Sequence, residues 1–396
     1  MKKSSLKILD IKDTCTGCGA CVSSCSKGAL QLEYDAEGFY FPVHNATRCI
    51  DCNLCEKACH ILNTEHLDAP SRDYTPYMVK AKSQDVVKAS SSGGVFSILA
   101  ERTLAMGGVV YGARYNYDTE RLEHSSTDLH PLDEFRKSKY FESYIGTTFQ
   151  EVALQLKKER QVLFVGTPCH VSALHHYLET KKVSTEKLIL ARFICHGVPS
   201  NRFFTEYKHW IENKVGSRLK HFDFRPKTRG WRVSNILLQF NNGKVIDELY
   251  PSNYFYFYFQ KNFTLRRSCY NCKKLFNEDA DITMADFWGI HKYAPENADN
   301  EGVSLLLLHS DKARALFNET RDNFTSEELP QSAVDYIYKD TADKEIQFED
   351  RNIKMSQIIK MGYMNHARKH FGNLIIKNKL KDFLRKLRDK FKNQNK

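Results

Sequence analysis

The sequence predicts a multidomain protein of mixed α+β and α/β class, with a small cysteine-rich N-terminal domain, a larger α/β domain and a basic C-terminal helix. Three observations predict it. A duplicated cysteine motif occupies the start of the chain, short aliphatic runs then alternate with helical patterns, and the end is rich in Lys and Arg. A chain of 396 residues, 41% of them hydrophobic and 12% aromatic, is long enough for two or three packed domains.

The N-terminal stretch MKKSSLKILDIKD lacks the apolar run of a signal peptide, and the longest aliphatic run, VSLLLLH, is too short to cross a bilayer. We therefore expect a cytoplasmic protein. In that compartment, the twelve cysteines are expected to bind metal or carry redox chemistry rather than to form a disulfide framework.

Two cysteine runs with the same spacing, CxxCxxCxxxC, fill the predicted domain at 1–67. In such a repeat, the first three cysteines of each run bind one iron–sulfur cubane and the fourth reaches across to the other. We expect one [4Fe-4S] cluster on Cys15, Cys18, Cys21 and Cys59. We expect the second on Cys49, Cys52, Cys55 and Cys25. Zinc is the competing metal, but its sites usually combine two separated pairs of ligands.

This stretch resembles a bacterial dicluster ferredoxin, with one departure. Ser26 and His60 follow the fourth cysteines, where that family usually has proline. Proline stiffens the exit turn but binds no iron, so the departure concerns turn geometry and not the ligands.

Residues 68–77, DAPSRDYTPY, are polar with two prolines and are expected to form a linker. Beyond them, the apolar runs GGVVYGA, QVLFVGTPC and KLILARFICHG predict buried strands of an α/β domain. Cys169 and Cys195 each follow such a run, and ligands gather at the carboxyl ends of strands in such sheets. The aromatic run NYFYFYFQKNF is expected to be a buried segment rather than a row of rings that stack on a flavin.

Outside the repeat the chain has four cysteines, Cys169, Cys195, Cys269 and Cys272. Four thiolates suffice for a third cubane and equally for an all-cysteine zinc site. A redox dithiol at Cys269 and Cys272 would be expected at a strand-to-helix turn, whereas this pair follows an aromatic run. From spacing alone, these four cysteines could bind an iron–sulfur cluster, bind zinc or remain separate structural thiols.

Six further segments carry a resemblance that covers nearly the whole chain: SSSGGVFSILA, SKYFESYIG, VLFVGTPCHVSAL, ICHGVPS, LRRSCYNCK and ADITMADFWGI. The sequence resembles the coenzyme F420 hydrogenase/dehydrogenase beta-subunit family, fused to an N-terminal dicluster ferredoxin. The resemblance implies an N-terminal-type segment at 78–155, a C-terminal-type segment at 156–345 and a helical basic tail at 346–396. It also implies FAD and a third [4Fe-4S] cluster on Cys169, Cys195, Cys269 and Cys272. His170 departs from the glutamine expected there, so F420 is not assumed to be the acceptor.

No GxGxxG fingerprint follows a strand, so a Rossmann mode of binding FAD is not expected. Instead, Ser91, Ser92, Gly93 and Gly94 open a helical pattern where backbone N–H groups can approach a pyrophosphate, although a simple serine N-cap fits equally well. Lys139 and Asp286 are candidate flavin contacts, with a surface lysine and a capped turn as the alternatives. The basic residues of FRPKTRGWR are candidates for an acidic cofactor tail or form a solvated loop: Arg225, Lys227, Arg229 and Arg232.

The formal net charge of +11 is concentrated in the tail. From Lys377 to Lys396, nine Lys and Arg oppose two Asp, a net +7 that leaves +4 for the rest of the chain. This nearly balanced body predicts no nucleic-acid partner. Apolar residues recur in the tail at helical spacing, at Leu380, Phe383, Leu384, Leu387 and Phe391. We expect an amphipathic helix docked on its own protein, the alternative being peripheral contact with an anionic membrane or an acidic partner.

Together these features predict a cytoplasmic iron–sulfur flavoprotein oxidoreductase. Ferredoxin or another redox protein is expected to exchange electrons with the N-terminal clusters, which relay them through the third cluster to FAD. The flavin then exchanges a hydride with a small-molecule acceptor or donor, and its N5 atom makes a protein acid or base unnecessary. One alternative is a non-catalytic electron-transfer subunit of a larger dehydrogenase or hydrogenase complex. Another is a ferredoxin-linked binding or regulatory module with a zinc site.

Overall fold

The structure is a computed structural model that describes residues 6–63, 73–272, 279–342 and 348–394. The N-terminal domain holds a two-stranded antiparallel sheet, β1 (Leu30–Tyr34) and β2 (Tyr40–His44). Short helices surround it: η1 (Lys7–Leu9), α1 (Ala20–Ser24), α2 (Leu54–Lys57) and α3 (His60–Asn63). Each cysteine run thus enters a short helix, α1 or α2, as the repeat predicts.

Eight strands of the described chain form one mixed sheet in the order β13-β3-β12-β11-β7-β6-β4-β5. Four central strands run parallel, β11 (Ile282–Asp286), β7 (Leu188–Phe193), β6 (Val162–Gly166) and β4 (Val109–Asn116). Antiparallel strands complete both edges, β5 (Arg121–Ser126) on one side and β12 (Ser304–Leu308), β3 (Thr75–Ala81) and β13 (Phe324–Glu328) on the other. The predicted α/β class is confirmed in this coarse form. Strand β3 begins at Thr75, inside the segment 68–77 that was expected to be a linker.

Helices cover both faces of this sheet because its central strands are apolar on both sides. On one face, α5 (Val95–Ala105) and α11 (Asp311–Thr320) pack over Val110, Leu163 and Ile189. On the other, α6 (Thr148–Lys157) and α7 (Pro168–Thr180) pack over Val109 and Phe164. The remaining short elements around the sheet are α4 (Gln84–Lys88), η2 (Leu132–Glu134), α10 (Ile290–Tyr293), η5 (Pro295–Asn297), η6 (Arg321–Asn323) and α12 (Gln331–Ala342).

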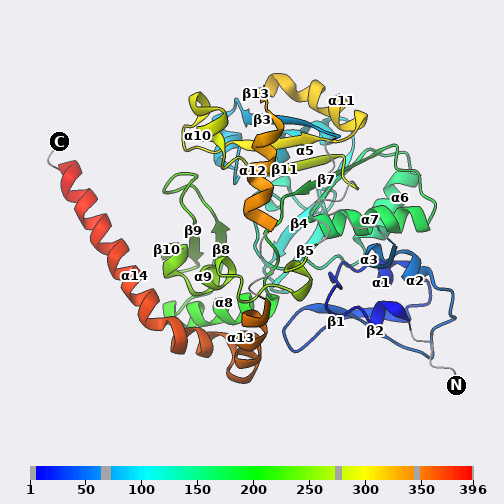
Figure 1. The fold of residues 1–396 in the computed structure, drawn as a ribbon, viewed down its shortest axis with the longest axis horizontal. Helices are drawn as coiled ribbons and strands as arrows, with labels where there is room; N and C mark the ends of the chain where they lie inside the picture. Colours follow the sequence, from blue (N-terminus) through cyan, green and yellow to red (C-terminus); the bar gives the residue numbers. More distant parts are fainter. Residues whose placement is uncertain (1–5, 64–72, 273–278, 343–347, 395–396) are drawn as a thin grey trace.

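The N-terminal domain rests on the face formed by α6 and α7, since Cys18, Ala20 and Ala58 belong to the same buried cluster as those helices. In Figure 1 this domain lies at the lower right, below α7. The two predicted segments at 78–155 and 156–345 both contribute strands to the large sheet.

A second, smaller sheet joins β8 (Leu219–Phe224), β9 (Asn235–Phe240) and β10 (Val245–Leu249). It packs with α8 (Asn201–Val215), η3 (Tyr250–Ser252), α9 (Tyr254–Gln260) and η4 (Arg267–Cys269) around an aromatic core. Every residue of α9 from Tyr254 to Phe259 is buried, with at most 8% of its surface exposed. The aromatic run is therefore a core segment, as predicted.

Two helices end the chain, α13 (Phe348–Met361) and α14 (Tyr363–Gln394). The first part of α14 packs on the aromatic core through Tyr363, Ala367 and Ile375, and its outer part extends away from the body (Figure 1). Polar contacts hold the helix as far as Asp382, but Leu380, Phe383 and Leu384 are exposed, so the expected docking through these apolar residues is not observed. Within the described ranges, no helix combines the length and the apolarity needed to span a membrane.

Candidate iron–sulfur and flavin site

The N-terminal cysteines gather in two small cavities. One is lined by Cys15, Cys18, Cys21 and Cys59, and the other by Cys25, Cys49, Cys52 and Cys55. Each cavity therefore holds three cysteines of one run and the fourth cysteine of the other. This is the crossed arrangement expected for two cubanes.

The thiols of these cavities are poorly suited to remain as unliganded thiolates. Burial, with the neighbouring thiols adding to it, raises the pKa of Cys18 to about 12. Burial likewise raises the pKa of Cys55 to about 11. A thiolate in such a place needs a compensating cation, which bound iron supplies. Four sulfur donors around each cavity thus fit the ligand set of a [4Fe-4S] cluster.

His60, which stands where dicluster ferredoxins usually have proline, links the two cysteine runs. It is fully buried, and its Nε2 atom lies 3.0 Å from the Oγ1 atom of Thr16, in the loop of the first run. The hydrogen bond fixes the exit turn of the second run, which proline would otherwise stiffen through its ring.

The other four cysteines also come together. Strands β6 and β7 are parallel neighbours, so their carboxyl ends meet and place Cys169 and Cys195 at the same edge of the sheet. Cys169 interacts electrostatically with Cys195, Cys269 and Cys272, and burial followed by these interactions raises its pKa well above the ordinary value. The Cys195 sulfur accepts a hydrogen bond from Gly197 N–H at 3.3 Å, and the Cys169 sulfur lies 3.0 Å from Thr167 Oγ1.

Arg266 connects the two cysteine regions, and sequence reasoning missed it. Its guanidinium donates to the Cys15 carbonyl oxygen at 2.7 Å and to the Tyr40 carbonyl oxygen at 2.8 Å, both in the N-terminal domain. It also forms a buried ion pair with Glu142. Because Cys269 lies three residues further along the chain, one buried side chain joins the Cys15 loop to the Cys269 turn.

Gly17 allows this close approach. Its φ of +67° suits glycine, and a Cβ atom there would lie 2.6 Å from Glu142 Oε1 and 2.8 Å from Arg266 Nη1. Any larger residue would displace the ion pair that holds the two regions together.

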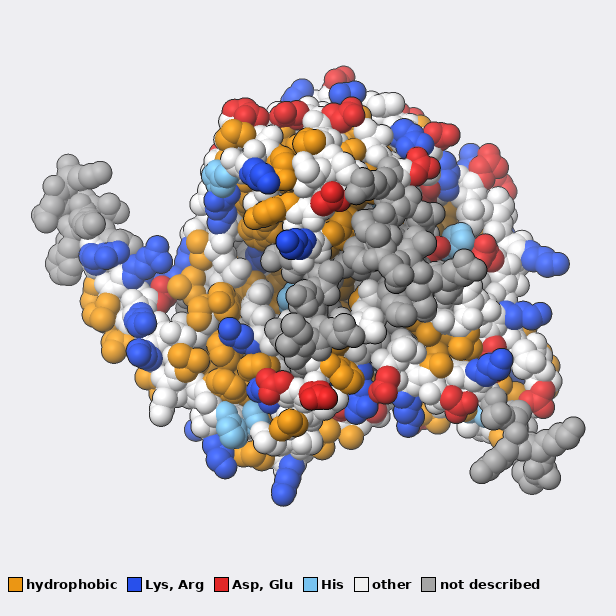
Figure 2. Space-filling view, viewed as in Figure 1, with side chains coloured by type: hydrophobic (Ala, Val, Ile, Leu, Met, Phe, Trp, Pro, Cys, Tyr) orange, Lys and Arg blue, Asp and Glu red, His pale blue; other side chains and the backbone are white. Residues whose placement is uncertain are grey.

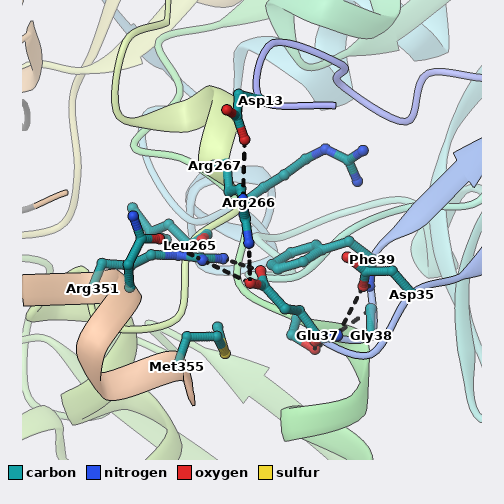
Figure 3. A network of polar contacts seen from close by, with 12 residues as sticks. Asp13, Asp35, Glu37, Gly38, Phe39, Leu265, Arg266, Arg267, Arg351 and Met355 are labelled. Carbon is teal, nitrogen blue, oxygen red and sulfur yellow. Dashed lines mark hydrogen bonds and ion pairs between the residues drawn. The ribbon is translucent and has the colours of Figure 1, made fainter. Parts of the chain in front are cut away.

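A second buried charge centre fastens the β1–β2 hairpin to the C-terminal part of the chain. The Glu37 carboxylate accepts hydrogen bonds from Arg351 and, at 3.0 Å, from Arg267 (Figure 3). Burial raises the pKa of Glu37, but the two guanidiniums outweigh it and hold this pKa below the ordinary value. The hairpin of the first domain is thus held by α13, although the two are far apart in sequence.

The predicted flavin contacts share one neighbourhood. Ser91 Oγ accepts a hydrogen bond from Ser138 N–H at 2.9 Å, which brings the SSSGG turn to the SKY segment. Lys139 follows in that segment, donates to the Arg136 carbonyl oxygen at 2.7 Å, and has its pKa lowered to about 7 by burial. The turn precedes α5, as predicted.

The glycines of this turn serve the packing of the sheet. Gly93 N–H donates to Ser304 Oγ at 2.9 Å, and a Cβ atom on Gly93 would lie 2.5 Å from the Val79 carbonyl oxygen. Ser92 Oγ donates to the Val303 carbonyl oxygen at 2.8 Å. The Gly93 amide is therefore engaged within the protein and does not point to an open phosphate site.

Of the four basic residues in FRPKTRGWR, two reach this neighbourhood. Lys227 donates to the carbonyl oxygens of Ser92 and Val87, each at 2.7 Å, and burial lowers its pKa to about 8. Arg225 forms an ion pair with Asp286 and lies over the Trp288 ring.

The other two basic residues lie elsewhere. Arg229 pairs with Asp247 and with Asp382 of α14, and the Arg232 backbone N–H donates to Asn300 Oδ1. Asp286 also accepts from Trp231 Nε1 at 3.0 Å, so it is a partly buried ion-pair member at the end of β11.

Two buried histidines contact each other beside Cys169. The rings of His124 and His170 are 4.9 Å apart, and burial lowers the pKa of His124 to about 4 and that of His170 well below its ordinary value. His170 follows Cys169 in α7, and Lys139 contributes to the lowered pKa of His124. Both rings are therefore neutral at pH 7.

Residues 159–332 match the family model for the C-terminal part of the beta subunit of coenzyme F420 hydrogenase/dehydrogenase, and residues 14–61 match the "4Fe-4S dicluster domain". No curated protein matches the chain. A chain from a solved structure of the F420-reducing [NiFe] hydrogenase complex from Methanosarcina barkeri is 13% identical, with a TM-score of 0.48 over 72% of this chain and 94% of that one. The chain thus carries a domain at residues 159–332 that is similar to the C-terminal part of the coenzyme F420 hydrogenase/dehydrogenase beta subunit, and a 4Fe-4S dicluster domain at residues 14–61.

Proposed function

We propose that this protein is an iron–sulfur flavoprotein oxidoreductase that transfers electrons between a ferredoxin-type carrier and a small-molecule hydride acceptor or donor. A single observation carries the proposal. Arg266 joins the Cys15 loop of the dicluster domain to the turn of Cys269, and His170, next to Cys169, contacts His124, whose pKa the charge of Lys139 helps to lower.

Cys169, Cys195, Cys269 and Cys272 are proposed to hold a third [4Fe-4S] cluster. Their mutual electrostatic contacts and the burial of Cys169 support a shared ligand set. Lys139, Ser91, Ser92 and Asp286 are proposed to border FAD. When bound, the clusters supply one-electron transfer and the flavin supplies hydride transfer.

Three features of the chain would support this electron transfer: Arg266, the two neutral histidines and Lys139. Arg266 holds the loop of Cys15 against the turn of Cys269. The neutral His170 follows Cys169, and its ring contacts His124, whose pKa the charge of Lys139 helps to lower. Lys139, with its pKa lowered to about 7 by burial, can hold or release a proton near neutral pH beside the proposed flavin.

A second candidate function is that of an electron-transfer subunit without turnover of its own. The matched family is described as a beta subunit, which favours a partner protein that completes the enzyme. In that case the same residues position the same clusters, and a stable complex with a dehydrogenase or hydrogenase would be isolated. A third candidate, a regulatory module with zinc on the second cysteine group, has only the ligand count in its favour.

The experiment is anaerobic purification of the full chain followed by iron, sulfide, zinc and flavin analysis and a visible spectrum. The proposal expects about twelve iron atoms per chain, as three cubanes contain, together with one FAD that reduced ferredoxin bleaches. Eight iron atoms with one zinc and no flavin would favour the regulatory module instead. Twelve iron atoms and FAD, with hydride transfer only after a second protein is added, would favour the subunit.

A further inference from the structure

The outer part of α14 exposes a stripe of large apolar side chains. Ile376, Leu380, Phe383 and Leu384 are 62%, 57%, 57% and 55% exposed, and Leu387 is 37% exposed. At about 100° per residue, these positions fall on one side of the helix. A helix of a soluble protein normally turns such a stripe toward the core.

Here the polar side of the helix faces the protein instead. Asn378 Nδ2 donates to the Pro251 carbonyl oxygen at 2.7 Å, and Asp382 accepts from Arg229 Nη1 at 2.8 Å. Both residues are two positions away from Leu380, which places them about 160–200° around the axis. The helix is therefore fastened in an orientation that directs its apolar stripe outward.

Basic residues border the stripe on both sides. Between Ile376 and Arg388 the helix carries six cations against a single carboxylate, Asp382. On the helical wheel, Lys377, Lys381 and Arg388 fall on one border of the stripe. Lys379 and Lys386 fall on the other border, where they pair with Glu248 and Asp382. Figure 2 shows orange and blue side chains alternating along this projecting helix.

We propose that this stripe, Ile376 to Leu387, binds the surface of a membrane that contains anionic phospholipids. The helix lies in the interface, with its apolar side chains below the headgroups and its cations at their level. A second copy of the chain is a poor occupant, because two such helices would bring ten excess positive charges together, five from each copy. In a bilayer, the acyl chains can contact the apolar side chains of the stripe while the anionic headgroups contact the lysines and arginines beside it.

The position of the stripe leaves the cysteine sites accessible. In Figure 1 the outer end of α14 lies at the left and the dicluster domain at the right. A protein held on a membrane by this helix would keep its N-terminal clusters open to a soluble redox partner. The inference concerns attachment and does not depend on the flavin or on the third cluster.

The test is co-sedimentation of the full chain with vesicles of phosphatidylcholine alone or mixed with phosphatidylglycerol. We expect binding to the anionic vesicles that weakens at high salt, and at least tenfold weaker binding to the neutral ones. Phe383→Ser combined with Leu384→Ser should lower binding to anionic vesicles at least tenfold, and so should Lys377→Glu combined with Lys381→Glu. All four side chains are exposed, so the fold is expected to survive these changes.

Two matched controls complete the experiment. Ile353→Ser changes an apolar side chain on α13 that is 59% exposed, and Lys157→Glu with Lys158→Glu changes two exposed cations at the end of α6. Both should bind like the wild type. The proposal is overturned if the Phe383 and Leu384 variant binds anionic vesicles as well as the wild type. It is also overturned if those substitutions abolish a dimer formed without lipid, or if poly-glutamate binds more tightly than the vesicles.

Discussion

The Arg266 guanidinium and the Glu142 carboxylate form a buried ion pair, with Nη1 2.7 Å from Oε1, where the dicluster domain meets the rest of the chain. Both side chains are at most 3% exposed. Glu142 Oε2 also accepts from Tyr40 N–H at 3.1 Å, and the Arg266 guanidinium lies 4.3 Å from the centre of the Phe41 ring. This single pair therefore contacts strand β2 of the N-terminal hairpin and lies beside the turn that carries Cys269.

Arg266→Met is expected to lower the free energy of unfolding by about 3–5 kcal/mol, because it leaves the Glu142 carboxylate buried without its partner. Two carbonyl oxygens, those of Cys15 and Tyr40, lose their donor as well. Urea unfolding followed by circular dichroism measures the loss. The matched control is Arg102→Met, which breaks an exposed pair with Glu319 and should cost less than about 1 kcal/mol.

Replacing both partners separates ion pairing from packing. Arg266→Met combined with Glu142→Leu should recover part of the stability lost in Arg266→Met, because no buried charge remains unpaired. If Glu142→Leu lowers the free energy of unfolding further in the Arg266→Met background, the unpaired carboxylate is not the cause of the destabilisation.

Arg351→Met is expected to loosen the hairpin between β1 and β2. Arg351 is 1% exposed and gives two hydrogen bonds to the Glu37 carboxylate, which would then keep only the more exposed Arg267. Hydrogen exchange should become faster at the hairpin amides, those of Glu37 and Phe39 among them. Lys354→Met, on the same helix, removes a pair with the exposed Asp350 and should leave this exchange unchanged.

The free energy of unfolding is expected to fall in mild acid, and His124 is one of several histidines with pKa values lowered by burial that contribute to the fall. Burial lowers its pKa to about 4 in the folded protein, whereas an unfolded histidine titrates near 6.5. Between these values the unfolded chain binds the proton and the folded one does not, so stability is full above pH 6.5 and is lost as the pH falls toward 4. The contribution is about 3 kcal/mol at most.

Urea unfolding at pH 7, 6 and 5 measures this slope. His124→Gln, which keeps polar atoms near Ser143 Oγ and the Val165 carbonyl oxygen, should show a shallower decline than the wild type. Parallel declines in the two proteins would show that another group carries the acid sensitivity.

Lys139→Met is expected to weaken FAD binding roughly ten- to a hundredfold if this lysine borders the cofactor, since a charge-assisted hydrogen bond contributes about 1.5–3 kcal/mol. Equilibrium dialysis of the flavin-free protein gives the dissociation constant. Lys158→Met removes an exposed lysine after α6 and serves as the control. Equal FAD affinity in the two variants would remove Lys139 from the flavin site.

The sequence predicted those parts of the candidate site whose residues lie close together in the chain. The dicluster ligands follow from a local spacing, and the meeting of Cys169 with Cys195 follows from two parallel strands whose carboxyl ends share one edge. Arg266 and Glu142 stand in two of the segments that carry the family resemblance, but 124 positions separate them and no local spacing shows that they pair. Arg351 and Glu37 are 314 positions apart, and neither lies in a motif.

The sequence also did not predict which side of α14 faces the protein. A helical pattern predicts that Leu380 and Leu384 share a face, but it does not say whether that face meets the body or the solvent. Contacts made by residues on the opposite face decide this, and the partner of Asp382 is Arg229 in a loop more than a hundred positions earlier. The sequence offered two interpretations of this loop, contact with an acidic cofactor tail or a solvated loop, and Arg229 instead anchors the helix.

Cys272→Ser is the most direct test of the second cysteine group. If Cys169, Cys195, Cys269 and Cys272 hold a cubane, replacing one thiolate by a hydroxyl should remove about four iron atoms per chain, because serine is a poor iron ligand. The dicluster cavities share no ligand with this group, so their eight iron atoms should remain. The side chain of Cys272 is exposed, so loss of packing does not explain a loss of iron. Ser172→Ala, on the same helix as Cys169 but outside the cysteine group, should keep all iron. Zinc measured on the same samples distinguishes the rivals, since loss of one zinc with iron unchanged would assign the group to zinc.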